Sequence, residues 1–204
     1  MTLYEHLSNF KRHSSVEELT ATFKKLAPHF IYGGYIKVNE AYRVYIRTIE
    51  FYYHDESNKP DAIKDPIMYH RNSDDDTNMP YFPIMTLNAH ISGYDITFEN
   101  REQSYRASAL IREYSIYDCR LNEFLPLKNN KMRDDRSTYL YDYLNGFSLN
   151  SNSGIVWIDD EHYPQKQLLQ YTRLRTYVVK DGEKTEDKRQ WRFKLDDDIW
   201  LPTD

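Results

Sequence analysis

The spacing of apolar residues is helical near the start of the chain and alternating over most of its later part. Ser15 and Glu18 form a capping-box pattern, which predicts a helix that begins directly after Ser15. Pro28 is expected to end this helix, because proline lacks the amide hydrogen that a helix interior needs. Residues 1–14 are polar and are expected to form a lead segment with at most one short helix. The apolar face of the helix repeats at Leu19, Thr22, Phe23 and Leu26.

Strand-like alternation covers most of the remaining chain, with turn residues between the segments. Ser137 or Thr138 can cap a second helix that ends at Asn145, and residues 184–188 are expected to be an exposed loop. We therefore predict an α+β fold. It is a single domain, residues 1–204, with a curved, mostly antiparallel (mixed) β-sheet flanked by a few helices. The predicted strands are residues 35–38, 42–53, 85–91, 94–99, 107–117, 155–158, 173–179 and 190–195.

The strand at residues 42–53 has an irregular pattern. Its apolar preference changes from one face to the other midway, which indicates a β-bulge or a sheet edge. Ile49 and Phe51 lie on the face that carries arginines in the first half of the strand. The other face carries Val44, Ile46, Thr48, Glu50 and Tyr52, so that an acid stands where the strand should be burying its side chains.

Composition and charge narrow the class of protein. The chain has 204 residues with 40% apolar and 29% charged residues, which is ordinary for a soluble protein. The net charge of -5 argues against a large basic footprint for nucleic acid, although one face can still be basic. Cys119 is the single cysteine, so no intramolecular disulfide forms and a reducing compartment is expected. No signal peptide and no long apolar run is present. We expect a cytoplasmic monomer without membrane contact.

Several motifs for cofactors and nucleophiles are missing. The sequence contains no GxxxxGK[ST], GxGxxG, CxxC, HExxH or GxSxG motif. The acid run at residues 74–76 lies in a long irregular stretch and is expected to be solvated, since it does not follow the spacing of a calcium loop. No cofactor and no metal is therefore expected.

Glu50 is the residue whose chemistry most needs an explanation. A carboxylate on a buried face requires a partner or a role. Arg112, which the alternation places on one face with Leu110 and Tyr114, is the obvious partner. The residues alone leave two interpretations open. One is a structural Glu50–Arg112 ion pair, and the other is a general base that the arginine keeps ionised beside a pocket of stacking rings.

The order of short motifs resembles the alkyladenine (3-methyladenine) DNA glycosylase family. The strand of Glu50 reads TIEFYY and is similar to the family's "ETEAY" strand. It comes after a segment, VEELTATFKKLAPHFIYGG, in the place of the family's N-terminal helix and glycine turn. Further matches, in the same order, are KDPIMYH with "D-x-x-x-H", SALIREY with "VLIRALEP", STYLYDYLNG with "GPxxLxxALGI", and RLRTYVV then QWRFKL with "RIGI … PWRFY".

The resemblance implies roles for matching positions. Glu50 falls where the family activates the attacking water, and Arg112 where an arginine lies near that carboxylate. Tyr52 falls where a tyrosine stacks on the flipped base, and His70 matches the pocket histidine. The family's "YVYxxYG" segment corresponds to TLNAHISGYD, where His90 could stack on the base. Candidates for the residue inserted into DNA are Ile91 and Tyr94, and the nearest counterparts of the asparagine that comes next are Asp95 and Thr97.

Three functions remain to be compared. The first is a monofunctional glycosylase that hydrolyses the N-glycosidic bond of an alkylated or modified purine in damaged DNA, with Glu50 as base. The second is a non-catalytic relative that binds a nucleobase, nucleoside or single-stranded nucleic acid. The third is a structural or interaction protein, which a sealed and fully paired Glu50 would favour. A basic rim around Glu50 would favour nucleic acid, and its candidate residues are Arg71, Arg101, Arg106 and Lys128.

Overall fold

A computed structural model of the chain describes residues 1–72, 78–125, 140, 144, 154–160, 167–173, 177–180 and 183–196. Two helices come first, α1 (Leu3–Ser8) and α2 (Val16–Ile31), and strands come after them. The strands are β1 (Gly34–Val38), β2 (Tyr42–Asp55), β3 (Leu87–His90), β4 (Gly93–Thr97), β5 (Tyr105–Asp118), β6 (Glu123–Phe124), β7 (Ile155–Asp159), β8 (Leu169–Tyr171), β9 (Tyr177–Lys180), β10 (Glu183–Glu186) and β11 (Arg192–Lys194).

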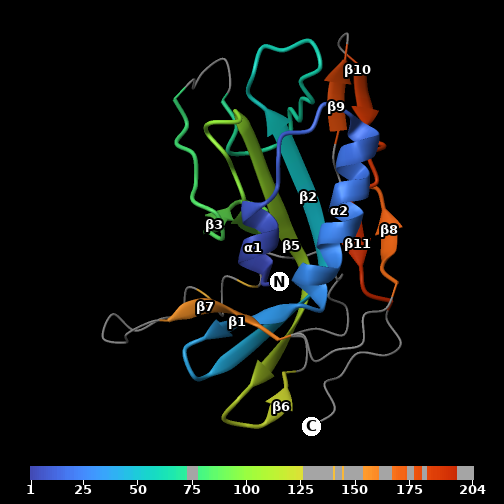
Figure 1. Ribbon diagram of the computed structural model, residues 1–204. Helices are drawn as coiled ribbons and strands as arrows, with labels where there is room; N and C mark the ends of the chain where they lie inside the picture. The colour runs from blue at the N-terminus through green and yellow to red at the C-terminus, as the bar shows by residue number, and fades with distance from the viewer. Residues whose placement is uncertain are drawn as a thin grey trace.

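Strand β2 organises the main sheet. One edge of β2 pairs with β5 along its whole length, and the other edge is shared between β1 and β11. The sheet continues through β4 and β3 on one side and through β7 and β8 on the other, and every described ladder is antiparallel. Figure 1 shows that the sheet curls and that α2 runs along it. The predicted α+β class with a curved antiparallel sheet is confirmed, whereas no parallel pairing occurs among the described strands.

Helix α2 begins as its capping signal predicts. The Ser15 hydroxyl accepts a hydrogen bond from the Glu18 amide at 3.3 Å and donates to the Glu17 carboxylate at 2.8 Å. The prediction that Pro28 ends the helix is wrong, because the helix continues to Ile31. Proline near the end of a helix forfeits only one backbone hydrogen bond. The burial of the last two helical residues, Phe30 and Ile31, keeps the final turn in place.

The N-terminal lead is part of the folded unit. Thr2 and Glu5 form a reciprocal capping box at the start of α1. Leu3, Leu7 and Phe10 are buried in the same core as the apolar face of α2. The short helix expected within residues 1–14 is α1, and three of the apolar residues of this segment, spaced three or four apart, attach it to the core.

The main core is aromatic and lies between α2 and one face of the sheet. The rings of Phe23 from α2 and Phe51 from β2 stack with centroids 4.4 Å apart and planes 5° from parallel. Phe30, Phe98 and Phe193 surround Phe51 with centroid distances of 5.7, 6.3 and 5.7 Å. Phe51 therefore joins the helix to strands β2 and β11 and to the residue directly after β4.

The irregular pattern of β2 is a bulge shared with β5. Ile46 pairs with Tyr114 and Ile49 pairs with Ile111, with register shifts between them. Arg47 and Arg112 lie at these shifts and are skipped by the pairing. This corrects two expectations. Val44 and Ile46 do not share a face with Glu50, and Tyr114 does not share a face with Arg112, because the alternation reverses at the bulge.

The C-terminal part differs from the expected strands and loop. Residues 184–188 were expected to be an exposed loop, but β10 pairs with β9 over part of this range and Asp187 is buried. Residues 173–179 were expected to form one strand, but β8 stops at Tyr171 and β9 starts at Tyr177, with residues 174–176 outside the described part. The predicted helix ending at Asn145 also lies outside it, except for Leu140 and Leu144, which are buried.

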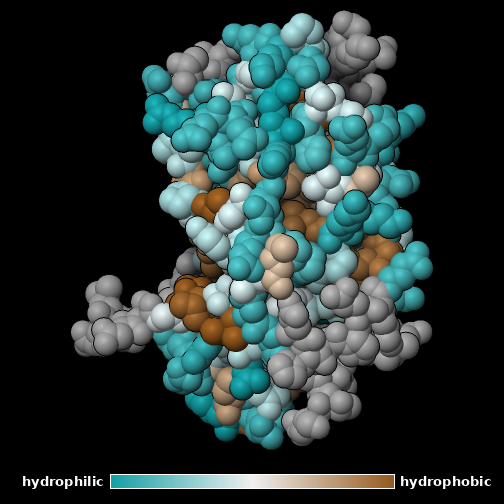
Figure 2. Space-filling view, in the orientation of Figure 1, coloured by the Kyte–Doolittle hydropathy of each residue, from teal (hydrophilic) through white to brown (hydrophobic). Residues whose placement is uncertain are grey.

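The visible surface is largely polar. Figure 2 shows hydrophilic residues over most of this face and an apolar patch at the level of β7, where Ile155 and Val156 are exposed. Among the described residues, no helix has the length and apolar character needed to span a membrane.

The stack at the centre of the core yields a stability prediction. Phe51→Ala removes the ring that contacts α2, β11 and Phe98, and should lower the free energy of unfolding by about 3–5 kcal/mol. Urea unfolding followed by circular dichroism measures this change. Tyr4→Ala removes a ring that is 56% exposed and should change the free energy by less than about 0.5 kcal/mol. Equal effects of the two substitutions would contradict the assigned core.

Candidate functional site

The second face of the sheet, opposite the aromatic core, is both polar and buried. Side chains alternate between the two faces of a strand, so the residues between the core positions point to this second face. Such burial requires a cover, which parts of residues 56–72 and 78–86 provide on this side, since Met68, His70 and the backbone of residues 79–83 contact this face. We call the following residues the polar layer: Glu50, Tyr52 and His54 on β2, Asp95, Thr97 and Glu99 on and after β4, and Arg106, Ser108 and Leu110 on β5. All of them are buried.

The strand register arranges the polar layer in rows. Asp95 pairs with Leu110, and Leu110 pairs with Glu50, so these side chains form one row across β4, β5 and β2. The next row is Thr97, Ser108 and Tyr52. Leu110 is the one apolar member of the polar layer. Met68 from the cover packs with Tyr52 and Leu110 in a small apolar cluster that is separate from the main core.

Glu50 binds Arg112 and Tyr52 through one carboxylate oxygen. Its Oε2 accepts hydrogen bonds from the Tyr52 hydroxyl at 3.0 Å and from Arg112 Nε at 2.7 Å, and it lies 2.6 Å from Arg112 Nη2. The Glu50 side chain is 0% exposed and that of Arg112 is 12% exposed. Burial is the largest single influence and would lower the pKa of Arg112, but the charges and hydrogen bonds of Glu50 and Tyr52 together outweigh it and raise the pKa. The predicted contact is therefore present as a charge-assisted, nearly enclosed pair.

Two histidines converge on Asp95 at the other end of the row. The Nε2 atoms of His70 and His90 lie 3.3 and 3.2 Å from Asp95 Oδ2. His70 Nδ1 also contacts Glu99. Burial opposes a charged imidazole, but Asp95 and Glu99 outweigh it and raise the pKa of His70 to about 9. Burial would raise the pKa of Asp95, but the contacts with His70 and His90 lower it to about 2.

Arg106 and Glu99 hold the second part of the cover. Arg106 donates to the backbone oxygens of Met79 and Pro80 at 2.7 and 2.8 Å and to Glu56 at 2.6 Å. Glu99 Oε2 accepts a hydrogen bond from the Phe82 amide at 2.8 Å. Charged groups of the sheet thus satisfy backbone groups of an irregular segment, which keeps that segment against the polar layer.

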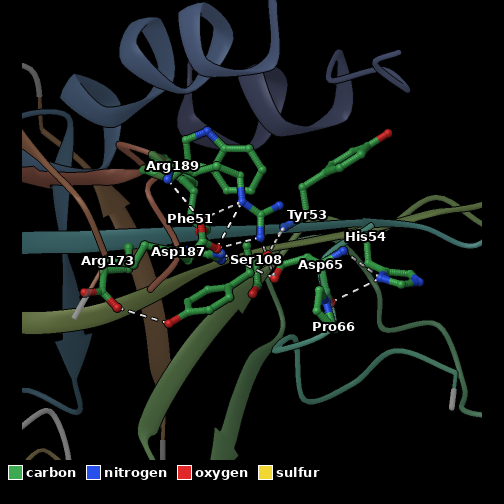
Figure 3. Close-up of polar contacts among 12 residues, drawn as sticks. Phe51, Tyr53, His54, Asp65, Pro66, Ser108, Arg173, Asp187 and Arg189 are labelled. Carbon is green, nitrogen blue, oxygen red and sulfur yellow. Dashed lines mark hydrogen bonds and ion pairs between the residues drawn. The ribbon is translucent and has the colours of Figure 1, made fainter. Parts of the chain in front are cut away.

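A second ionic network reaches the polar layer from the C-terminal part. Arg173 Nη1 lies 2.6 Å from Asp65 Oδ2, and Arg173 also binds Asp187 (Figure 3). Arg189 Nη2 bridges the same two carboxylates at 3.1 and 2.6 Å. Burial would lower the pKa of Arg173, but Asp65, Tyr52 and Asp187 together outweigh this effect and raise the pKa. The Arg173 guanidinium lies 4.5 Å from the centroid of the Tyr52 ring, so it occupies one face of that ring.

His54 anchors the start of the cover. Its Nδ1 accepts a hydrogen bond from the Asp65 amide at 3.0 Å, which Figure 3 shows beside the ionic network. Burial lowers the pKa of His54, which favours the neutral ring that this hydrogen bond requires.

The five predicted site residues lie on one side of the sheet in two groups. Glu50, Tyr52 and Arg112 are in direct contact, and His70 and His90 meet at Asp95. Tyr52 does not face a histidine ring. Its ring contacts Arg173, whereas His70 contacts Phe82 at 5.7 Å and His90 contacts Tyr69 at 4.7 Å between centroids.

The candidate basic rim is incomplete. Arg106 is buried and bound to Glu56 and Glu99. Arg71 binds the backbone oxygens of Pro66 and Asn72. Arg101 is exposed, and Lys128 lies outside the described residues. The described arginines near Glu50 therefore serve mainly to neutralise and hold the polar layer and its cover.

A groove lies elsewhere on the protein, away from the polar layer. It has a volume of about 610 Å³ between the first half of α2 and residues 188–190, and it contains none of the predicted site residues. Within the described ranges, no group of three or more His, Cys, Asp or Glu side chains is arranged to hold a metal ion. The acid run at residues 74–76 lies in the undescribed range 73–77.

No protein-family model, no curated protein and no solved structure matches this chain. Membership of the glycosylase family therefore remains a prediction from the order of its sequence motifs. The arrangement of the polar layer has to be interpreted from its own chemistry.

Most of the charged residues of the polar layer and its networks were not predicted from the sequence. Polar residues at every second position of DITFE, which runs from β4 to two residues beyond it, and of YRASA in β5 could have signalled a polar face. They did not signal that this face is buried, because the cover is distant in sequence. The unpredicted residues are Asp65, Glu99, Ser108, Arg173, Asp187 and Arg189.

The raised pKa of His70 yields a pH prediction. Its charged form is favoured in the folded state, so its contribution to stability is complete below about pH 6.5 and is lost as pH rises through about 9. The loss should be roughly 3 kcal/mol. Urea unfolding of the wild type and His70→Gln between pH 6 and 10 measures it. The variant should lack this part of the decline, and identical curves for both proteins would contradict the assigned charge.

The Arg173 network yields a second prediction. Arg173→Met leaves buried Asp65 and Asp187 with less counter-charge and should lower the free energy of unfolding by about 3 kcal/mol. Arg120→Met is the control, because Arg120 pairs with Asp118 but is 62% exposed, and should cost at most about 1 kcal/mol. Both values come from urea titrations. A loss for Arg173→Met no greater than that of the control would refute the assigned buried pairing of Arg173 with Asp65 and Asp187.

Proposed function

We propose that this protein binds a modified purine base on the polar layer and hydrolyses its N-glycosidic bond, with Glu50 activating the attacking water. One observation carries the proposal: the residues selected from sequence motifs meet on one face of the sheet, although they come from separate strands and a loop. Glu50, Tyr52 and Arg112 touch, and the two histidines lie at the other end of the same row.

The chemistry of Glu50 suits this role. A general base must be held in a fixed position, and the hydrogen bonds from Arg112 and Tyr52 hold Glu50 through Oε2. A base that carries a positive charge after alkylation leaves readily. A single carboxylate can then both orient a water and stabilise the positive charge that develops on the sugar.

The turn between β3 and β4 suits contact with a nucleic acid. Ile91 is 81% exposed at this turn, and Tyr69 beside it is 57% exposed. Tyr69 contacts the ring of His90 and the hydroxyl of Ser92, so these residues lie together. Apolar side chains of this kind can wedge between stacked bases and help to extrude one. Tyr94, the other candidate, is buried in the core, which leaves Ile91 for this role.

The cover has to move for this reaction to occur. Met68 is 3% exposed and packs against Tyr52 and Leu110, in the space between Glu50 and Asp95. A bound base would take the place of the Met68 side chain on Leu110. Methionine is unbranched and adapts easily, so its displacement is less costly than that of a branched side chain.

A second candidate function is a non-catalytic relative that binds a nucleobase without cleaving it. The enclosure of Glu50, at 0% exposure, favours the two functions without catalysis, this alternative and a structural or interaction protein, because the carboxylate has no direct contact with solvent. The position of Arg173 favours this alternative too, because its guanidinium occupies one of the two faces of the Tyr52 ring on which a base could stack. If this second candidate is right, the protein binds a free modified base and releases none from DNA.

Base release from alkylated DNA separates the two candidates. Wild type should release modified purines, and Glu50→Gln should reduce the rate by at least about 100-fold, since the amide cannot accept the proton from water. Glu113→Gln is a matched control. Glu113 is a buried carboxylate paired with Arg192 and Lys194 at 3.0 and 3.3 Å, and its loss should leave base release within about threefold of wild type.

In this experiment, circular dichroism serves as the control that all three proteins are folded. Release by neither wild type nor Glu50→Gln, with both folded, would refute the hydrolytic proposal for this class of base. Equal rates for Glu50→Gln and wild type would refute the assigned role of Glu50.

A further inference from the structure

Asp95 has one carboxylate oxygen that no described residue satisfies. Its Oδ2 accepts a hydrogen bond from the Ser108 hydroxyl at 3.2 Å and is approached by His70 and His90 at 3.3 and 3.2 Å. Its Oδ1 has no hydrogen-bond partner in the described part of the chain, although the Asp95 residue is 3% exposed. An unsatisfied buried acceptor is costly and rare in folded proteins. Such an atom indicates a missing donor.

The position of Asp95 relates this oxygen to Glu50. Asp95 and Glu50 flank Leu110 in one row, two strand spacings apart, which corresponds to about 9.5 Å between their backbones. Leu110 lies between them and packs with Tyr52 and Met68 in the small apolar cluster. An apolar patch with one ionic group at each end fits an apolar ring that has a polar edge.

We infer that Asp95 Oδ1 accepts an N–H from the edge of the bound base and thereby selects bases with an amino group over bases with a carbonyl oxygen at that position. This inference rests on the proposed function and specifies its class of substrate. An ionised carboxylate can only accept hydrogen bonds. An amino group satisfies Oδ1, whereas a carbonyl oxygen would leave two acceptors facing each other without a proton between them.

The surroundings of Asp95 allow this selection to be inverted. In Asp95→Asn, the Ser108 hydroxyl and the two histidines would still favour an oxygen on their side of the residue. The amide nitrogen would then stand in the place of Oδ1 and would donate a hydrogen bond instead of accepting one. The variant should therefore prefer a base with a carbonyl oxygen.

Binding of free bases tests this inference apart from catalysis. Isothermal titration calorimetry compares 3-methyladenine with 3-methylhypoxanthine, which differ by an amino and an oxo group at one ring position. Wild type should bind the amino base at least about 10-fold more tightly, because a site built for a hydrogen bond rejects a ligand that leaves it unpaired. Asp95→Asn should reverse this preference. Asp118→Asn is the control, since Asp118 is a buried aspartate that pairs with Arg120 at the end of β5, outside the polar layer, and it should retain the wild-type preference.

The outcomes separate this inference from the proposed hydrolysis. Equal binding of the two bases by wild type, or binding of neither, would overturn the role of Asp95 even if Asp95→Asn did not fold. An unchanged preference in a folded Asp95→Asn would also overturn it. Base release from DNA together with equal binding would leave the hydrolysis standing and refute only the selection. Reversal of the preference without base release would support the selection and refute the hydrolysis.

Discussion

The bulge shared by β2 and β5 is the constraint on which the rest of this structure depends. A strand exposes alternate side chains to alternate faces, so without the skipped residues Arg47 and Arg112 the second half of β2 would be reversed. Glu50 would then point among the phenylalanines of the main core, and Phe51 would leave it. The bulge instead places the Phe51 side chain in the core that α2 covers and the Glu50 side chain on the opposite face.

A polar face that is buried has to be neutralised, and this requirement explains the form of the cover. Breaking a buried ion pair is costly, although such a pair adds little net stability compared with apolar packing. The pairs of Arg106 with Glu56 and of Arg173 with Asp65 therefore act less as stabilisers than as fixed attachment points. They hold irregular segments in one position over the sheet. Arrangements of this type are common where chemistry takes place, because functional groups must be both ionised and fixed.

The elements that could be predicted from the sequence are those with local signals. The start of α2, most strands and the antiparallel sheet result from caps and alternation, and the change of face in β2 indicated either a bulge or a sheet edge, of which the structure shows the bulge. The end of α2 was predicted wrongly, because Pro28 is a strong local signal that the burial of Phe30 and Ile31 overrides. The hairpin at β9 and β10 was missed, since its second strand is highly charged.

The sequence by itself indicated that the acid on a buried face of β2 needs a cationic partner on a neighbouring strand, because an unpaired buried charge is costly. It thereby identified Glu50 and Arg112 as partners. Only the tertiary structure decided that Glu50 is enclosed, that Arg173 lies on the ring of Tyr52, and that Asp95 keeps an oxygen without a partner among the described residues. These facts depend on segments that are far apart in the chain and are brought together by burial and charge. No periodicity within one segment contains that information.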